Sequence, residues 1–263
     1  MQLSPSSHYK ILETQIQELI VSISSHPHLT YYQLTTFYYQ AQQFPLHKFT
    51  FTPHQDPWLT IGIFAGIHGD EPAGLYACLD FIQKLIFNPT LAQNCRLLIY
   101  PICNPAGLSL SQRTLPNGLD LNRIFWTNSQ QPEVRSLENE LKSYHFDGIL
   151  ALHSDDTADG IYGYVGGDLL TRHLLEPALQ SASAFIPRSQ SPLIDGWKAT
   201  NAIIEQCFNG ILTASPSQFP KPFEIVFETS AKFSLNLQIS AHTAAISAIL
   251  EAAIRLHSHA LNL

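Results

Sequence analysis

Apolar residues recur along the chain with two different periods, which predict strands and helices in alternation. A continuous apolar run at 58–65 is typical of a strand that is buried on both faces of a sheet. Runs rich in apolar, aromatic or β-branched residues predict further strands at 31–39, 49–51, 96–102, 147–153, 210–214 and 223–228. Helical spacing of apolar residues predicts helices at 9–24, 71–87, 132–144, 169–182, 199–208 and 237–261. Loops are expected at 104–125 and 155–167.

The alternation of strands and helices indicates the α/β class. We expect residues 1–263 to form a single domain with helices on both faces of a mixed, mostly parallel central sheet. Residues 1–45 are expected to be an N-terminal covering segment, because the amphipathic helix at 9–24 carries an apolar stripe but no candidate chemistry.

Composition and charge narrow the possible partners. The net charge of −7 and the lack of any basic run argue against a nucleic-acid partner or an anionic membrane surface. We find no apolar stretch of the length that a membrane-spanning helix needs. Residues 1–5 lack the features of a signal peptide, so a cytoplasmic location is expected. None of the four cysteines belongs to a C-x-x-C pair, which predicts buried or half-buried thiols in a reducing compartment.

Candidate chemistry lies at the ends of three predicted strands, where α/β proteins place their sites. His68 and Glu71 follow the strand at 58–65, His153 ends the strand at 147–153, and Glu228 ends the strand at 223–228. Two imidazoles and a carboxylate suit a catalytic Zn²⁺ with an open fourth position, and a further carboxylate would deprotonate water there. Taken singly, His153 also fits a core histidine, and Glu228 fits an ion pair with a lysine.

The predicted loop at 104–125 carries a more specific pattern. Residues 113–125 closely resemble the R-x-x-x-x-G-x-D-L-N-R-x-F stretch of the zinc carboxypeptidase superfamily. Residues 104–107 resemble its N-P-D-G turn, with Ala106 in place of the aspartate. Residues 66–71 match its G-x-H-G-D-E motif, residues 152–154 its third-ligand strand, and residues 227–228 its terminal glutamate. On these motifs the chain is identified as a member of the M14-type metallocarboxypeptidase clan in its broad sense.

The resemblance implies a zinc carboxypeptidase-like fold and one Zn²⁺ per chain. His68, Glu71 and His153 would bind the metal, and Glu228 would act as general base and then as general acid. Arg113 would stabilise the oxyanion of the tetrahedral intermediate.

The resemblance also implies a substrate site. Asn122 and Arg123 would hold the free carboxylate of the substrate, which agrees with the bidentate geometry of a guanidinium group. Tyr162 and Tyr164 are candidates for a tyrosine in the catalytic pocket, although packing against the sheet also explains them.

Several smaller questions stay open in the sequence. Asp70 would either orient a ligand histidine or cap the following helix. Arg188 and Lys221 would be substrate contacts or surface charges. Spare histidines such as His54 leave room for a second metal ion. The oligomeric state is not determined by the sequence.

Three branches of the clan compete: carboxypeptidases, murein-peptide amidases, and deacylases of the succinylglutamate desuccinylase/aspartoacylase type. Only 35 residues follow Glu228, whereas such deacylases usually carry a further β-rich domain there. We therefore expect hydrolysis of a small peptide, with an N-acyl amino acid as the alternative substrate; residues 153–157 do have some likeness to the deacylases. A metal-binding protein without catalysis is the alternative from another class.

Overall fold

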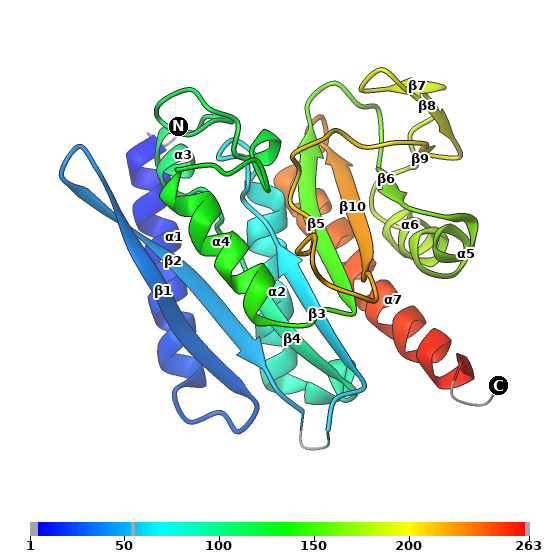
Figure 1. The fold of residues 1–263 in the computed structure, drawn as a ribbon, viewed down its shortest axis with the longest axis horizontal. Helices are drawn as coiled ribbons and strands as arrows, with labels where there is room; N and C mark the ends of the chain where they lie inside the picture. The colour runs from blue at the N-terminus through cyan, green and yellow to red at the C-terminus, as the bar shows by residue number, and fades with distance from the viewer. Residues whose placement is uncertain (1–4, 54–55, 261–263) are drawn as a thin grey trace.

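The molecule is organised around a ten-stranded mixed sheet with the order β1-β2-β4-β3-β5-β10-β6-β9-β8-β7 (Figure 1). The computed structural model describes residues 5–53 and 56–260. The strands are β1 (Leu29–Tyr39), β2 (Gln42–Phe51), β3 (Leu59–Phe64), β4 (Cys95–Tyr100), β5 (Gly148–Asp155), β6 (Tyr162–Val165), β7 (Leu193–Ile194), β8 (Trp197–Thr200), β9 (Ile203–Ile204) and β10 (Phe223–Ser230). The helices, in which η marks short 3-10 or π segments, are α1 (Pro5–Ile23), α2 (Pro72–Phe87), η1 (Pro89–Ala92), α3 (Pro105–Leu110), η2 (Leu121–Arg123), α4 (Pro132–Ser143), α5 (Asp168–Leu170), η3 (Thr171–Leu175), α6 (Glu176–Ala182) and α7 (Leu235–Ala260).

The centre of the sheet is parallel and buried. Strands β4, β3, β5 and β10 pair in parallel, whereas β1, β2 and β6 join antiparallel. All of β3 except Thr60 and all of β4 except Arg96 is buried, which explains why these strands read as unbroken apolar runs. The predicted α/β class and the mixed, mostly parallel sheet are confirmed.

Helices cover both faces of the sheet, as expected. In Figure 1, α4 crosses the near face, and α1, α2 and α7 lie behind the sheet. Helix α7 is the one described helix that is long and apolar enough to cross a membrane, so the expectation that no such stretch exists was wrong. Of that apolar stretch 56% is buried inside the molecule, where α7 packs against α2 and α6. This packing accounts for its apolar sequence.

The N-terminal segment does more than cover the sheet. Helix α1 packs against α2, α3 and β1, whereas β1 and β2 form a hairpin that extends the sheet itself. The short strand expected at 49–51 is the last part of β2.

The helix predicted at 199–208 is wrong, because this segment forms the hairpin of β8 and β9. Asn201 and Ala202 both have positive φ, 53° and 67°, which is the backbone of a tight hairpin turn. Ile203 and Ile204 are β-branched and favour the strand that follows.

The strand predicted at 210–214 is also wrong. Side chains, and not a neighbouring strand, bond the backbone here: Asn122 Oδ1 accepts from Leu212 N at 2.9 Å, and Glu224 Oε1 accepts from Ala214 N at 2.6 Å. The segment is irregular, and its apolar residues Leu212 and Ala214 are buried in the main hydrophobic core.

Three predicted segments contain more structure than expected. The loop at 104–125 includes α3, whose N-cap Asn104 accepts a hydrogen bond from Gly107 N, and also η2. The loop at 155–167 includes β6. The helix predicted at 169–182 is divided into α5, the π-helical η3 and α6, and Pro177 lies at the start of α6. The four cysteines are free, with Cys207 half-buried and the other three fully buried, as expected.

Candidate active site

The loop between β3 and α2 is shaped by its glycines. Gly66 has a φ of +58°, which an L side chain rarely adopts. A Cβ atom at Gly69 would lie 2.1 Å from the backbone of Gly107, so only glycine allows the loop to approach α3 this closely. The resulting turn carries His68 and then Glu71, which occupies the N-cap position of α2.

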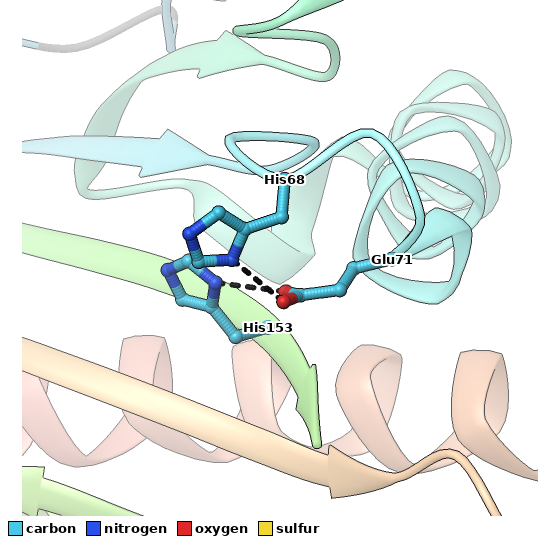
Figure 2. A group of neighbouring side chains, drawn as sticks. All are labelled: His68, Glu71 and His153. Carbon is cyan, nitrogen blue, oxygen red and sulfur yellow. Dashed lines mark hydrogen bonds and ion pairs between the residues drawn. The ribbon is translucent and has the colours of Figure 1, made fainter. Parts of the chain in front are cut away.

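Three side chains converge at this edge of the sheet (Figure 2): His68 from the loop, Glu71 from the start of α2 and His153 from β5. The distance from His68 Nδ1 to Glu71 Oε1 is 2.6 Å, and that from His153 Nδ1 to Glu71 Oε2 is 2.9 Å. All three side chains are buried, and one potential ligand atom of each lies within 4.8 Å of the others. Two imidazole nitrogens and a carboxylate oxygen in this arrangement fit a zinc ion.

A second layer of contacts orients these three groups. Asp120 Oδ1 is 3.2 Å from His68 Nε2, so this ring presents Nδ1 to the site. The backbone N–H of Ser154 donates to Glu71 Oε2 at 3.0 Å. Burial would raise the pKa of Glu71, but the neighbouring His153 and His68 lower it by more. Glu71 is therefore held as a carboxylate.

Glu228 lies beside this group, because β10 and β5 pair in a register that places Glu228 opposite His153. Burial raises the pKa of Glu228 well above its ordinary value, and the negative charges of Glu71, Asp155 and Asp195 raise it further. A carboxyl group with a raised pKa is suited to exchange a proton during a reaction.

A cavity of about 340 Å³ opens onto these residues. Arg113, Asn122 and Arg123 line it, as does Tyr162. The cavity size is within the range of small-molecule sites. The structure thus brings every predicted metal ligand, the predicted base and the predicted substrate residues of the 113–125 loop to one place.

Each arginine is held by a different contact. Arg113 donates from Nε to Asp120 Oδ2 at 3.1 Å and from Nη1 to Glu71 Oε1 at 3.3 Å. Arg123 donates from Nη1 to the Asn122 carbonyl oxygen at 2.9 Å, and its guanidinium carbon lies 4.2 Å from the ring centroid of Phe208.

The two candidate tyrosines differ in position. Tyr162 lines the cavity, and its hydroxyl donates to Asp155 Oδ2 at 2.9 Å. Tyr164 is not among the residues lining the cavity; like Trp197, it packs against a small apolar cluster that includes Ile204 and Tyr162 itself.

The other open questions receive partial answers. Asp120, and not Asp70, bonds to His68, and Glu71 itself is the N-cap residue of α2. Arg188 pairs with Glu176 at 2.8 Å, and Lys221 donates to the carbonyl oxygens of Ser215 and Pro216. His54 lies outside the described residues.

Sequence reasoning missed several residues of the cavity. Asp120 was part of the recognised motif but had no role there, although its position two residues before Asn122 was a usable signal. Asp195 and Trp197 lie in a stretch for which the sequence predicted no element, and Phe208 ends the segment that was wrongly predicted as a helix, so no signal placed them at the cavity wall.

Residues 57–188 match the sequence model of the succinylglutamate desuccinylase/aspartoacylase catalytic domain. The chain belongs to this desuccinylase/aspartoacylase family. The match includes all three predicted metal ligands and the arginine loop, whereas Glu228 and the β8–β9 hairpin lie beyond it.

Other relatives of this desuccinylase/aspartoacylase family member are carboxypeptidases. The chain is 27% identical to carboxypeptidase SOL1 of Arabidopsis thaliana over an alignment of 214 residues, and the match covers 66% of this chain and 44% of the plant protein. It is 31% identical to carboxypeptidase D of Mus musculus over an alignment of 109 residues, and this match covers 35% of this chain and 8% of the mouse protein. The chain thus spans less than half the length of these curated relatives.

Solved structures show the same fold. A candidate metallopeptidase from Shewanella amazonensis superposes with a TM-score of 0.78 at 20% identity, over 94% of this chain and 93% of that one. A metallo-carboxypeptidase from Burkholderia cenocepacia superposes with a TM-score of 0.71 at 15% identity, over 93% of this chain and 69% of that one. The predicted carboxypeptidase-like fold and the clan resemblance are confirmed, and the relatives are hydrolases.

Proposed function

We propose that this chain is a zinc-dependent hydrolase that cleaves an amide bond next to a free carboxylate. One observation carries the proposal: His68, Glu71 and His153 bring two imidazole nitrogens and a carboxylate oxygen within 4.8 Å of one another, and all three line a cavity that Glu228 also lines. These three would hold one Zn²⁺ per chain, and the site leaves room for water and a substrate.

Glu228 would move the proton in this reaction. When bound, zinc supplies Lewis-acid activation of water and of the scissile carbonyl group. Glu228 would accept a proton from the attacking water and then donate it to the leaving amine. The raised pKa of Glu228 favours its protonated form, which is the form that donates to the leaving amine. A positive charge held by the neighbouring ligands would lower this pKa toward the value that is needed to accept a proton from water.

The arginines would hold the charges of the substrate. Among the described residues, Arg123 forms one side-chain hydrogen bond, from Nη1 to the Asn122 carbonyl oxygen, and its guanidinium group lies against the ring of Phe208. Its other N–H groups would form a fork with a carboxylate. Asn122 Oδ1 accepts from Leu212 N, and its amide Nδ2 lies 3.5 Å from His153 Nε2, so the amide nitrogen is on the side of the predicted ligands. Arg113 is 44% exposed and would donate to the oxyanion.

A substrate panel with the zinc-loaded protein tests the proposal. Dipeptides, a murein tripeptide and N-acyl amino acids would be compared before and after metal removal by a chelator, with metal content measured in parallel. We expect hydrolysis that disappears with the metal and returns with zinc. A protein that holds zinc yet cleaves no compound in the panel would instead be a metal-binding protein without catalysis.

We propose a small peptide as the substrate, because the curated relatives are carboxypeptidases. A second candidate is deacylation of an N-acyl amino acid, which the family match over residues 57–188 favours. The two differ in the panel: exclusive cleavage of N-acyl amino acids would replace the first candidate by the second.

A further inference from the structure

A chain of buried polar side chains lies behind the predicted metal ligands, on the side of α7. Ser154 Oγ is 3.1 Å from Thr229 Oγ1 and donates to Gln238 Oε1, also at 3.1 Å. Thr229 Oγ1 in turn donates to Gln238 Oε1 at 3.2 Å and lies 3.1 Å from His242 Nε2. Gln238 Nε2 donates to the Phe233 carbonyl oxygen at 2.8 Å.

This polar chain is unusual for its surroundings. Thr229 and His242 are fully buried, Gln238 is nearly so, and the neighbouring residues on α7 include the buried Ala241 and Ala245. Burying polar groups costs free energy unless each is bonded, and an apolar core would avoid that cost. The presence of polar groups at this buried position therefore calls for an explanation other than packing.

The position of these polar side chains suggests an explanation. Ser154 and Thr229 are the residues directly after His153 and Glu228, and they are opposite each other in the β5–β10 register. The N–H of Ser154 also donates to Glu71 Oε2. Gln238 and His242 are four residues apart and so project from one face of α7. The polar chain thus ties the two strand ends to each other and to α7 at the point where they carry the predicted ligands and base.

We propose that Thr229, held by Gln238 and His242, is a positioning residue that fixes the ends of β5 and β10 and so sets the geometry of the metal ligands and of Glu228. This inference rests on the proposed function. It does not make Thr229 a catalytic residue, because its hydroxyl faces α7 and not the cavity.

The test uses three substitutions in the full chain. Thr229→Val keeps the shape of the side chain and removes the hydroxyl, whereas Thr229→Ser keeps the hydroxyl. Thr243→Val is the matched control: Thr243 is also nearly buried on α7, but its hydroxyl donates to Asp80 of α2 at 2.9 Å, away from the site. Zinc affinity by chelator competition, the visible spectrum of the cobalt-loaded protein, kcat, KM and the melting temperature would be measured.

We expect Thr229→Val to weaken zinc binding about tenfold or more, to shift the cobalt spectrum, and to lower kcat with KM within about twofold of wild type. Thr229→Ser should restore all three. Thr243→Val should lower the melting temperature alone. If Thr229→Val lowers only the melting temperature, as the control does, the polar chain is a structural anchor for α7 and the proposal is wrong. A Thr229→Ser variant as impaired as Thr229→Val would overturn it as well.

Gln238→Met serves as a second variant if Thr229→Val does not fold, because it removes the amide at similar length; it should show the same loss of zinc affinity and the same spectral shift. Unchanged zinc binding and an unchanged spectrum in Gln238→Met would equally overturn the proposal. Metal affinity and the cobalt spectrum need no substrate, so a failure of the hydrolase proposal in the panel would leave this test intact.

Discussion

Glu228 faces the cavity beside the predicted metal ligands but is not one of the three groups that converge there. Its replacement by glutamine therefore separates proton transfer from metal binding. We expect Glu228→Gln to keep its zinc and to lose at least about 10²-fold in kcat, since general acid–base catalysis typically contributes 10²–10⁴-fold. Metal analysis and steady-state kinetics check this. Full activity in this variant would remove Glu228 from the mechanism.

His153 is expected to behave in the opposite way. His153→Ala deletes one of the three converging groups, so zinc affinity should fall by orders of magnitude and activity should fall with it. His145→Ala is the control, because His145 is exposed and bonds only the Phe219 carbonyl oxygen among the described partners. Equal zinc content in the two variants would disqualify His153 as a ligand.

The sequence allowed prediction of those site residues that belong to compact motifs. His68 and Glu71 are three residues apart, and Arg113, Asn122 and Arg123 share one loop, so their spacing was visible. Contacts between distant residues were not visible: 52 residues separate Asp120 from His68. Such contacts depend on strand register and helix packing, which a local sequence pattern does not predict.

The β8–β9 hairpin and the segment after it form one wall of the cavity. Phe208 from this wall lies against Arg123, with Trp197 at 5.9 Å from Phe208. We expect Phe208→Ala to raise KM about two- to fivefold with little change in kcat, because a cation–π contact at an exposed site contributes about 0.5–1 kcal/mol. Phe219→Ala, at a 76% exposed phenylalanine away from the cavity, should leave KM unchanged. A KM for Phe208→Ala equal to that of the control would show that the wall does not hold Arg123.

An ion pair between the buried Lys48 and the partly buried Glu140 joins β2 to α4. Lys48 Nζ donates to Glu140 Oε2 at 2.7 Å and to the Tyr144 hydroxyl at 3.1 Å, and the Tyr100 hydroxyl donates to the same carboxylate oxygen. Burial would lower the pKa of Lys48, but these hydrogen bonds raise it above its ordinary value of 10.5. The resulting contribution to stability is fully present below that ordinary value and is lost as the pH rises through the raised pKa.

We therefore expect Glu140→Gln to reduce the free energy of unfolding by about 3–5 kcal/mol at neutral pH, because it leaves a buried charge without its partner. The alkaline loss of stability due to Lys48 should also become smaller in this variant. Denaturant unfolding at pH 7 and pH 11 measures both effects. The control is Glu251→Gln, which breaks an exposed pair with Arg255 and should cost less than about 1 kcal/mol; a similar loss in the two variants would contradict the buried-pair argument.

Among the strands, the buried central ones were the easiest to predict from the sequence. Strands β3, β4, β5 and β10 lie in the centre of the sheet, and their apolar runs predicted them. The short strands β8 and β9 lie near the edge, and their turn depends on an alanine at positive φ, which no residue preference predicts. The segment at 210–214 is apolar like a strand but is bonded by side chains from remote elements, so its pattern was misleading.

For the whole molecule, the three predicted ligands come from segments that are 82 residues apart, between Glu71 and His153. Zinc would bind only the folded chain and would therefore stabilise it. At a free zinc concentration about 100 times Kd, the gain is about 2.7 kcal/mol, which corresponds to a rise of roughly 5–10 °C in Tm for a domain of this size. Calorimetry with zinc and with a chelator measures the difference. Identical Tm values would mean that the three groups do not form a metal site.

Alkylation of the buried cysteines would measure local unfolding of the protein. Cys78 lies in α2, Cys95 begins β4 and Cys103 follows it, so all three thiols are in the framework that supports the loop carrying His68 and Glu71. Burial raises the pKa of each, that of Cys95 to about 12, and a thiol that stays protonated resists alkylation. Each thiol becomes reactive only when this framework opens. The rate at which each cysteine is labelled, followed by mass spectrometry, therefore measures local unfolding.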